Sequence, residues 1–352
     1  MSTTSTTPPM RGTDAPRHHH RYSRRRRRSR RAAWAMLSLP LAAVALYAMI
    51  CLIAFLVMRR PARHFDATNN PGRFGVSYQE VRFRSRSGDV RVAAWQIPAA
   101  GSDRALVLVP GKDSSRSDEL DGHFPELAAA LARRGFNVLM IDLRGHGQSD
   151  AAPFGFGPDE KRDVEGAVDF LKTQGFRAGS IGVLGVSLGA AAGIYAAADD
   201  PDIGALVEDS SYAALGPILQ RDWQGATRLP EFFLPGTELI DRWIDHRDVT
   251  TIVPADQIAR IAPRPVMIVH GAIDGLIPVQ DAYDLAAADP LAAIWIVPQA
   301  VHAGAYQVKP DAYVNRVSDF FSSALGHGSD ASSANDRPTG LPSRRQSPAH
   351  AR

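Results

Sequence analysis

A serine between two glycines is the first feature of this 352-residue sequence that could carry out chemistry. Gly185, Ser187 and Gly189 form the pattern Gly-x-Ser-x-Gly, with an apolar run before it and a run of small residues after it. That order predicts a strand, a tight turn and a helix, in which the glycines let helix and strand approach closely and the serine takes a strained backbone conformation. The Ser187 hydroxyl is therefore expected at the edge of a sheet, beside a helix N-terminus, in the position of a nucleophile.

A serine hydroxyl is a poor nucleophile without a base, and His302 is the histidine that we predict for that role. The chain has 11 histidines, and most of them lie towards its two ends. His146 lies in a loop ahead of the serine, and His270 ends an apolar run just before the acid that could orient a base. His302 follows the last apolar run, where a loop could fold back over the edge of the sheet.

The acid that would orient this base is predicted to be Asp274, in the loop after the apolar run at 266–269. Its carboxylate would hold the imidazole tautomer and stabilise the imidazolium that forms. Asp209, at the end of the preceding run, is the alternative acid, and an Asp-Gly turn is the structural alternative for Asp274 itself. The three side chains predict attack by Ser187 on a carbonyl carbon, without a metal or an organic cofactor.

Such an attack needs two backbone N–H groups to stabilise the oxyanion. Leu188, directly after the serine, is expected to supply one of them. The other is expected from Lys112, in the loop after the apolar run at 105–109, where Gly111 allows a close turn. The alternative for Lys112 and Asp113 is that they bind a charge on the substrate.

The elements that must position these residues follow an alternating pattern. Two alternating segments, at 78–84 and 90–97, predict an antiparallel pair of strands. Short continuous apolar runs, typical of strands that are buried on both faces of a parallel sheet, follow at 105–109, 138–141, 181–186, 205–207, 266–269 and 294–297. Helical stretches separate most of them. The sequence thus predicts an α/β fold with a mostly parallel eight-stranded sheet and helices on both faces.

One interval, about 210–264, breaks this alternation. It contains no strand-like run, and its large apolar residues are punctuated by prolines. We interpret it as a small helical cap over the carboxyl ends of the strands, because a long irregular connection is uncommon inside a compact domain. The whole domain is expected to span about residues 74–325.

An apolar run at 32–58 predicts an uncleaved transmembrane signal-anchor helix, because about 20 residues suffice to cross the hydrocarbon core. Residues 1–31 are expected to be a disordered, Arg-rich cytoplasmic tail, 59–73 a linker and 326–352 a second disordered tail. Ten arginines precede the run and three follow it, so the bias of positive charge places the N-terminus in the cytoplasm and the domain outside a cell membrane that the chain crosses once. A buried core helix and an organelle transit peptide are the alternatives.

Composition and charge exclude several classes of protein. With 45% hydrophobic and 22% charged residues the chain is neither collagen-like nor wholly disordered, and the single Cys51 excludes an intrachain disulfide and a cysteine-rich zinc site. Residues 1–63 hold 13 arginines and one acid, whereas the remainder holds 27 basic and 36 acidic residues. The basic character therefore belongs to the tail, and an acidic folded part argues against nucleic acid as a partner.

Four motifs, in this order, resemble the α/β-hydrolase superfamily, near its membrane-anchored serine hydrolases of the dienelactone-hydrolase and serine-aminopeptidase-like kind. They are the Pro110-Gly111 loop, Asp142-x-Arg144-Gly145-His146-Gly147-x-Ser149, the Gly185-to-Gly189 turn, and Gly271-x-x-Asp274 followed by His302. The resemblance covers about residues 78–325 and implies Ser187 as nucleophile, His302 as base and Asp274 as acid. The family often has His-Gly in place of Pro110-Gly111, and the loop at 144–147 is a landmark of its fold, so His146 stays outside the expected catalytic set.

The sequence thus predicts a membrane-anchored serine hydrolase that cleaves an ester, thioester or amide through an acyl-enzyme on Ser187. The apolar cap favours a small-molecule or lipid-like acyl substrate. A catalytically silent hydrolase fold that acts as a surface binding module is one alternative. An Arg-tail protein that binds nucleic acid or lipid is another. Because an imidazolium cannot act as a base, activity is expected to fall on acidification as His302 becomes protonated.

Overall fold

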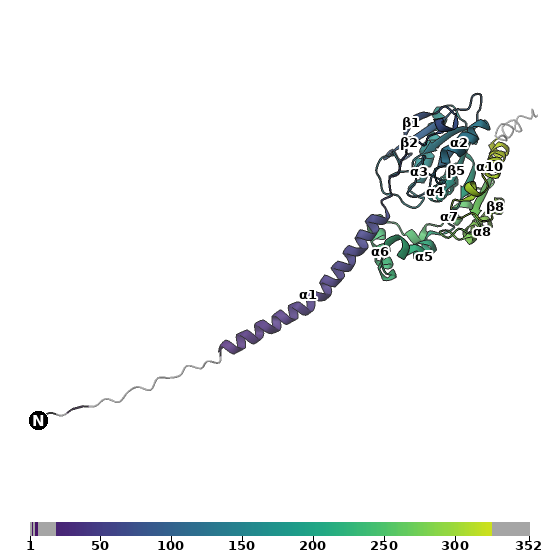
Figure 1. Ribbon diagram of the computed structural model, residues 1–352. Coiled ribbons are helices and arrows are strands. Elements are labelled where there is room, and N and C mark those ends of the chain that lie inside the picture. Colours follow the sequence, from purple (N-terminus) through teal and green to yellow (C-terminus); the bar gives the residue numbers. More distant parts are fainter. Residues whose placement is uncertain (1, 3, 6–18, 326–352) are drawn as a thin grey trace, which may run out of the picture.

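A single eight-stranded sheet forms the centre of the domain in the computed structural model, which describes residues 2, 4–5 and 19–325 (Figure 1). The strands are β1 (Gln79–Arg84), β2 (Arg91–Ile97), β3 (Ala105–Val109), β4 (Asn137–Ile141), β5 (Ile181–Val186), β6 (Ile203–Asp209), β7 (Val266–Gly271) and β8 (Ala293–Val297). Their order across the sheet is β1-β2-β4-β3-β5-β6-β7-β8. Strand β2 pairs antiparallel with β1 and β4, and all other pairs are parallel. The predicted mostly parallel eight-stranded sheet is confirmed.

Helices cover both faces of this sheet, because successive side chains of a buried strand point to opposite sides. On β3, Val107 packs into the core shared with α3 (Lys161–Thr173), α4 (Leu188–Asp199) and α8 (Val279–Ala288). Leu106 and Leu108 pack into the other core, with α2 (Phe124–Arg133) and α10 (Pro310–Leu325). The continuous apolar runs of the sequence thus become two separate hydrophobic layers.

Between β6 and β7 the chain forms the cap that the sequence predicts near residues 210–264. The cap consists of α5 (Leu215–Thr227), the 3₁₀ turn η2 (Glu231–Phe233), α6 (Leu234–Ile244), η3 (Val249–Thr251) and α7 (Pro254–Ile258). Pro235 and Pro254 lie in the first turns of α6 and α7, where a missing N–H leaves no hydrogen bond unmade. Two small apolar clusters hold the cap, one against Tyr195 and Tyr212 and one around Trp223.

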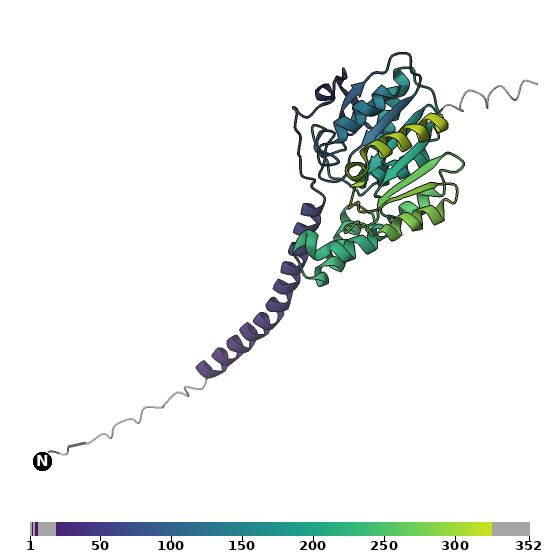
Figure 2. The ribbon, with the colours of Figure 1, turned by 45° about the vertical axis from the view of Figure 1, so that its right-hand side comes forward.

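A long helix, α1 (His19–Met58), precedes the domain and reaches it beside the cap (Figures 1 and 2). Its segment Ser38–Met58 is long and apolar enough to cross a membrane, and only 17% of its most apolar window is buried against the rest of the chain. That low burial is unlike a core helix of a soluble domain.

The start of α1 corrects one expectation. Residues 19–31, expected to be disordered, are helical. Arginine is a good helix former, and a helix nucleated in the apolar segment extends through such residues at little cost. The predicted tail at 326–352, and the first residues apart from 2 and 4–5, lie outside the described part of the chain.

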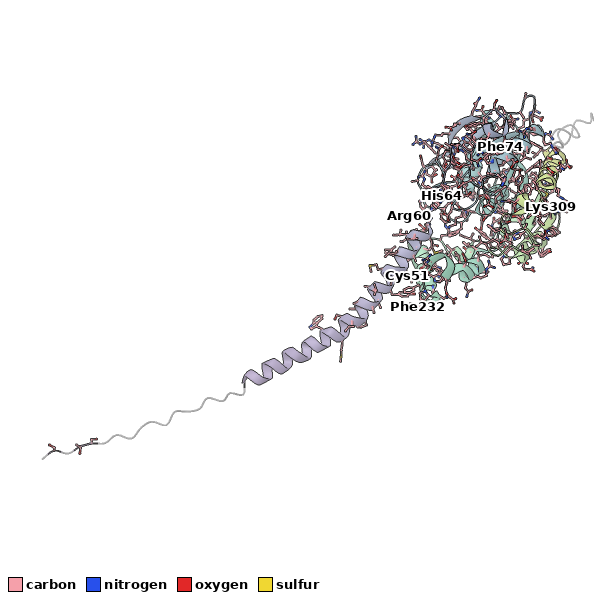
Figure 3. All side chains as sticks on the ribbon, in the orientation of Figure 1. Cys51, Arg60, His64, Phe74, Phe232 and Lys309 are labelled. Carbon is pink, nitrogen blue, oxygen red and sulfur yellow. The ribbon has the colours of Figure 1, made fainter. Side chains whose placement is uncertain are left out.

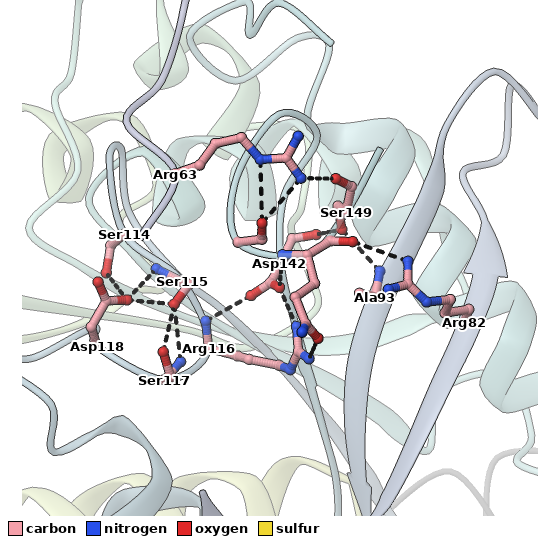
Figure 4. A network of polar contacts seen from close by, with 12 residues as sticks. Arg63, Arg82, Ala93, Ser114, Ser115, Arg116, Ser117, Asp118, Asp142 and Ser149 are labelled. Atoms are coloured by element: carbon pink, nitrogen blue, oxygen red, sulfur yellow. Dashed lines mark hydrogen bonds and ion pairs between the residues drawn. The ribbon is translucent and has the colours of Figure 1, made fainter. Parts of the chain in front are cut away.

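The predicted linker at 59–73 is fixed along the surface of the domain. The Arg63 guanidinium donates hydrogen bonds to the carbonyl oxygens of Gly147 and Ser149, as Figure 4 shows. The Asn69 side-chain amide donates to Ser117 O at 2.7 Å. A 3₁₀ turn, η1 (Pro71–Phe74), then leads into β1. These contacts fix α1 relative to the sheet.

Candidate active site

The turn between β5 and α4 holds Ser187 in a strained conformation, with φ 52° and ψ −115°. A Cβ built on Gly185 would lie 2.2 Å from Gly189 O, and one built on Gly189 would lie 2.4 Å from Val109 O. Only glycine fits at both positions, because real Cβ atoms do not approach other atoms so closely. The Ser187 N–H donates to Asp209 O at 2.8 Å, which ties the turn to the neighbouring strand. The strand–turn–helix prediction for this motif is confirmed.

The structure brings Ser187, His302 and Asp274 into one chain of hydrogen bonds. His302 Nε2 lies 2.9 Å from Ser187 Oγ, and His302 Nδ1 lies 2.8 Å from Asp274 Oδ2. The carboxylate can only accept, so Nδ1 carries the proton and Nε2 accepts from the serine hydroxyl. The Asp274 side chain is fully buried, whereas the imidazole is 21% exposed. The three groups come from the loops after β5, β7 and β8, at the carboxyl edge of the sheet.

Backbone groups of its own loop hold Asp274 in place. The N–H groups of Leu276 and Ile277 both donate to Asp274 Oδ1 at 2.8 Å, which leaves Oδ2 for the imidazole. The buried His270 donates its Nε2 proton to Ile277 O at 3.0 Å, and that nitrogen also lies 3.4 Å from Asp274 Oδ2. His270, which the sequence left outside the site, therefore contacts Asp274 and supports its loop.

The alternative acid, Asp209, does not reach the imidazole but supports the loop that carries it. Its carboxylate accepts from Ser210 Oγ and from the Tyr313 hydroxyl, both at 2.9 Å. Ser210 Oγ in turn accepts from the N–H of Ala303, the residue after His302, at 3.2 Å. Burial raises the pKa of Asp209, with the two hydroxyl donors partly offsetting the increase. Asp209 is thus a positioning residue rather than a partner of the base.

The two residues expected to stabilise an oxyanion both line the cavity above Ser187. Leu188 is the first residue of α4, so its N–H belongs to the first turn, whose N–H groups have no acceptor within the helix. Lys112, in the loop after β3, lines the same cavity. The Lys112 Nζ pairs with Asp113 Oδ2 at 2.5 Å, and this pairing weakens the alternative that the two side chains bind a substrate charge.

A buried glutamate that the sequence analysis missed fixes this loop. Glu119 Oε2 accepts the N–H of Gly111 at 2.6 Å, and Oε1 accepts the N–H of Leu120 at 3.1 Å. Burial raises the pKa of Glu119, and the two N–H donors counteract that increase. The bond to Glu119 occupies the Gly111 N–H, so the next N–H along the loop, that of Lys112, is the one left for an oxyanion.

The segment from Asp142 to Ser149 is structural in this protein (Figure 4). The buried Asp142 carboxylate accepts from the Arg116 backbone N–H at 2.8 Å and pairs with the Arg116 guanidinium. A Cβ on Gly147 would lie 2.2 Å from Asp142 Oδ2, so glycine is required there. His146 is fully buried, and its Nδ1 lies 2.8 Å from Arg144 O, a carbonyl to which it donates. It does not join the Ser187 site.

A cavity of about 480 Å³ opens above Ser187, within the range of small-molecule sites. Its walls are mostly apolar. They come from the cap, from the loop after β7 and from the end of α1, and include Leu215, Ile218, Leu219, Trp223, Ile277, Val57 and Met58. Among residues 19–325, no group of three or more His, Cys, Asp or Glu side chains is placed to hold a metal ion. The Ser187 hydroxyl, hydrogen-bonded to an imidazole, thus faces an apolar pocket with room for a small molecule.

Comparisons with known proteins define the class. The family model for the alpha/beta hydrolase family matches residues 106–343, more than half of the chain, and the chain belongs to that family. The protein is thus a hydrolase by family and fold. The sequence of the uncharacterized protein YfhR of Escherichia coli K12 is 26% identical over 257 residues, which cover 71% of this chain and 82% of YfhR.

Solved structures share the fold. The esterase Pf2001 of Pyrococcus furiosus superposes with a TM-score of 0.63 and 24% identity, over 76% of this chain and all of that one. The alpha/beta hydrolase GrgF of Penicillium sp. sh18 superposes with a TM-score of 0.56 and 18% identity, over 71% of this chain and 100% of its own. At these identities the likeness concerns the arrangement of sheet and helices.

Proposed function

We propose that the protein is a membrane-anchored serine hydrolase that cleaves carboxylic esters through an acyl-enzyme on Ser187. The observation that carries the proposal is the unbroken path from Ser187 Oγ through His302 to Asp274, with contacts of 2.9 and 2.8 Å. A strained serine with its own base, beneath an apolar cavity, is the arrangement that acyl transfer requires. The esterase activity named for Pf2001 agrees with an ester as the substrate.

In the proposed reaction, Ser187 Oγ attacks the ester carbonyl carbon while His302 Nε2 takes the hydroxyl proton. Asp274 stabilises the imidazolium through its hydrogen bond to Nδ1–H. The N–H groups of Leu188 and Lys112 stabilise the oxyanion of the tetrahedral intermediate. The intermediate collapses, His302 gives its proton to the leaving alcohol, and an acyl-enzyme remains. A water molecule, deprotonated by His302, then attacks the acyl group and releases the acid and free Ser187.

The anchor is the second part of the proposal. About 20 residues of the apolar run at 32–58 cross a membrane, with the Arg-rich N-terminus in the cytoplasm and the hydrolase domain on the outer side. Protease added to intact cells should then degrade the domain and spare the N-terminal tail. Degradation of the domain only after the cells are broken open would contradict this topology.

A fluorophosphonate probe tests the chemistry, because it phosphonylates an activated serine. The full-length wild-type protein should be labelled, and the variant Ser187→Ala should not. Ser322→Ala serves as a matched control, since it removes an exposed hydroxyl on α10, away from the proposed site, and it should label like the wild type. Equal labelling of wild type and Ser187→Ala, or labelling of neither, would contradict the proposal and favour a silent fold that acts as a binding module.

A further inference from the structure

The cap rests directly on the apolar part of α1 (Figure 3). The Tyr47 hydroxyl donates to Phe232 O at 2.8 Å, and the Tyr47 ring stacks on the Phe233 ring with centroids 5.2 Å apart. The crossing is so close that a Cβ on Gly236, in α6, would lie 2.6 Å from Cys51 Sγ. The cap thus contacts α1 inside the segment that is apolar enough to cross a membrane.

The position of this contact relative to a bilayer follows from the last charged residue before the apolar run and from the length of helix that crosses a membrane. Arg31 is the last charged residue before the apolar run, and it belongs at the inner boundary of the hydrocarbon. A helix needs about 20 residues to cross that hydrocarbon, which brings the outer boundary to about Cys51. Tyr47 and Cys51 therefore lie at or just below the outer boundary, and the cap residues that touch them lie at the same height.

At that height the cap exposes large apolar side chains. Phe232, Leu239, Trp243 and Ile244, which we call the apolar cap face, are between 43% and 79% exposed. Leu239 and Trp243 are four residues apart in α6 and share one side of the helix. Tryptophan is typical of the boundary between hydrocarbon and water. In water such a patch on a helix would be unfavourable, whereas beside a membrane helix it matches its surroundings.

Two neighbouring cavities lie between the end of α1 and Ser187. A smaller cavity of about 40 Å³ lies between α1, α5 and α6, with Phe55 and Leu234 in its walls. It shares Met58, Phe156, Leu219 and Trp223 with the large cavity above Ser187. The last turn of α1 is thus a wall of both cavities, and the residues that the two cavities share are apolar.

We infer that the apolar cap face lies in the outer leaflet and that the pocket receives the acyl chain of a membrane lipid ester from there. The lipid enters beside α1, its acyl chain occupies the apolar cavity, and its ester carbonyl reaches Ser187. The substrate part of this inference rests on the proposed ester hydrolysis at Ser187, whereas the position of the cap face in the leaflet rests only on the proposed membrane span.

Tryptophan fluorescence tests the position of the cap face without any need for activity. The full-length protein is reconstituted in vesicles of phospholipid that is brominated near the headgroup end of its acyl chains, and bromine quenches nearby indoles. Trp243→Phe should remove part of the quenchable emission, whereas Trp295→Phe, on strand β8, should leave it unchanged. If the wild type and Trp243→Phe show equal quenchable emission, the inference is overturned. If the protein also forms a stable dimer in that case, the apolar cap face is assigned to contact with a second copy of the chain.

Hydrolysis rates test the substrate. In vesicles, Leu239→Ser combined with Trp243→Ser should lower the rate on a vesicle-embedded diacylglycerol about tenfold and leave the rate on water-soluble p-nitrophenyl butyrate unchanged. Leu291→Ser, an equally exposed leucine outside the cap, should change neither rate. A wild-type protein that cleaves the soluble ester but not the embedded lipid, or a variant with equal loss on both esters, would overturn the lipid inference and leave the proposed function standing. A wild-type protein that cleaves neither ester and takes no fluorophosphonate label would overturn the proposed function instead.

Discussion

Two regions of the molecule are held by different kinds of contact. One is the carboxyl edge of the sheet that carries Ser187, Asp274 and His302, which we call the rim, and the other is the region where the cap meets α1, which we call the corner. At the rim, buried polar groups fix each loop after a strand: Asp274 accepts two backbone N–H groups, and Ser210 links Asp209 to the His302 loop. At the corner the contacts are mainly apolar, and large hydrophobic side chains stay exposed. The rim thus holds the side chains of Ser187, Asp274 and His302 in fixed positions, whereas the corner leaves an apolar surface exposed.

The largest expected effect is chemical and confined to the rim. Ser187→Ala should lower the hydrolysis of a soluble ester by at least about 10⁴-fold, because no other hydroxyl among residues 19–325 is paired with His302. The Ser187 side chain donates only to that imidazole, so the unfolding temperature should stay within a few degrees of the wild type. Steady-state kinetics and thermal unfolding measure the two effects. Substantial residual activity in the variant would place the nucleophile elsewhere.

Two further variants compare a buried ion pair with an exposed one. Asp142→Ala leaves the Arg116 guanidinium buried without its carboxylate and should lower the free energy of unfolding by about 3–5 kcal/mol. Arg242→Ala in the cap removes a half-exposed pair with Asp248, whose hydrogen bonds from Thr250 stay in place, and should cost about 1 kcal/mol or less. Denaturant unfolding gives both values. Similar losses in the two variants would erase the proposed difference between rim and corner.

A buried acid in β6 gives the sheet a pH dependence. Burial raises the pKa of Glu208 from 4.5 to about 8, and only its Oε2 has a hydrogen bond, from the Ser211 N–H. The folded protein keeps this proton up to pH about 8, whereas the unfolded chain releases it near 4.5, so the group lowers stability as pH rises through that interval.

Glu208→Gln removes this titration and keeps an oxygen that can accept the Ser211 N–H. The variant should be more stable than the wild type by on the order of 2 kcal/mol at about pH 9, and the advantage should shrink towards pH 5. Thermal unfolding across this pH range is the measurement. A stability difference that does not change with pH would show that Glu208 does not titrate as described.

The smallest effect is expected at the corner. Gly236→Ala puts a Cβ 2.6 Å from Cys51 Sγ, so α6 must shift away from α1. Amides of α6 should exchange with solvent about tenfold faster in a hydrogen-exchange experiment, while those of β5 keep their protection. Gly216→Ala is the matched control, since its Cβ would lie 3.7 Å from Thr250 Cα, an ordinary contact. Faster exchange in β5 as well would mean that rim and corner unfold as one unit.

The sequence predicted the rim well, because its signals are local. Each apolar run marks a strand, and Ser187, Asp274 and His302 each follow one of them, so the topology of a parallel sheet brings them to one edge. The two glycines that flank Ser187 are also explained locally, because a Cβ at either position would clash with neighbouring backbone atoms. The structure agrees on where these residues lie, and their catalytic roles stay predictions.

Other parts depend on pairings between distant segments, for which the sequence holds no periodic signal. Glu119 binds the Gly111 N–H, and Asp209 supports the His302 loop through Ser210, contacts that only the folded chain reveals. The contact of α6 with α1 was equally hidden, because both segments are apolar and either could have faced lipid alone. The features that the sequence could not predict are therefore long-range side-chain contacts rather than elements of secondary structure.

Rapid quenching of the full-length wild-type enzyme during ester hydrolysis tests the central claim most directly. After digestion, mass spectrometry of the peptide that contains Ser187 should show the mass of the substrate's acyl group on that serine, formed in a burst that matches the enzyme concentration. Ser187→Ala should show neither burst nor adduct. An active wild-type enzyme with no acyl adduct, or with the adduct on another residue, would contradict the account.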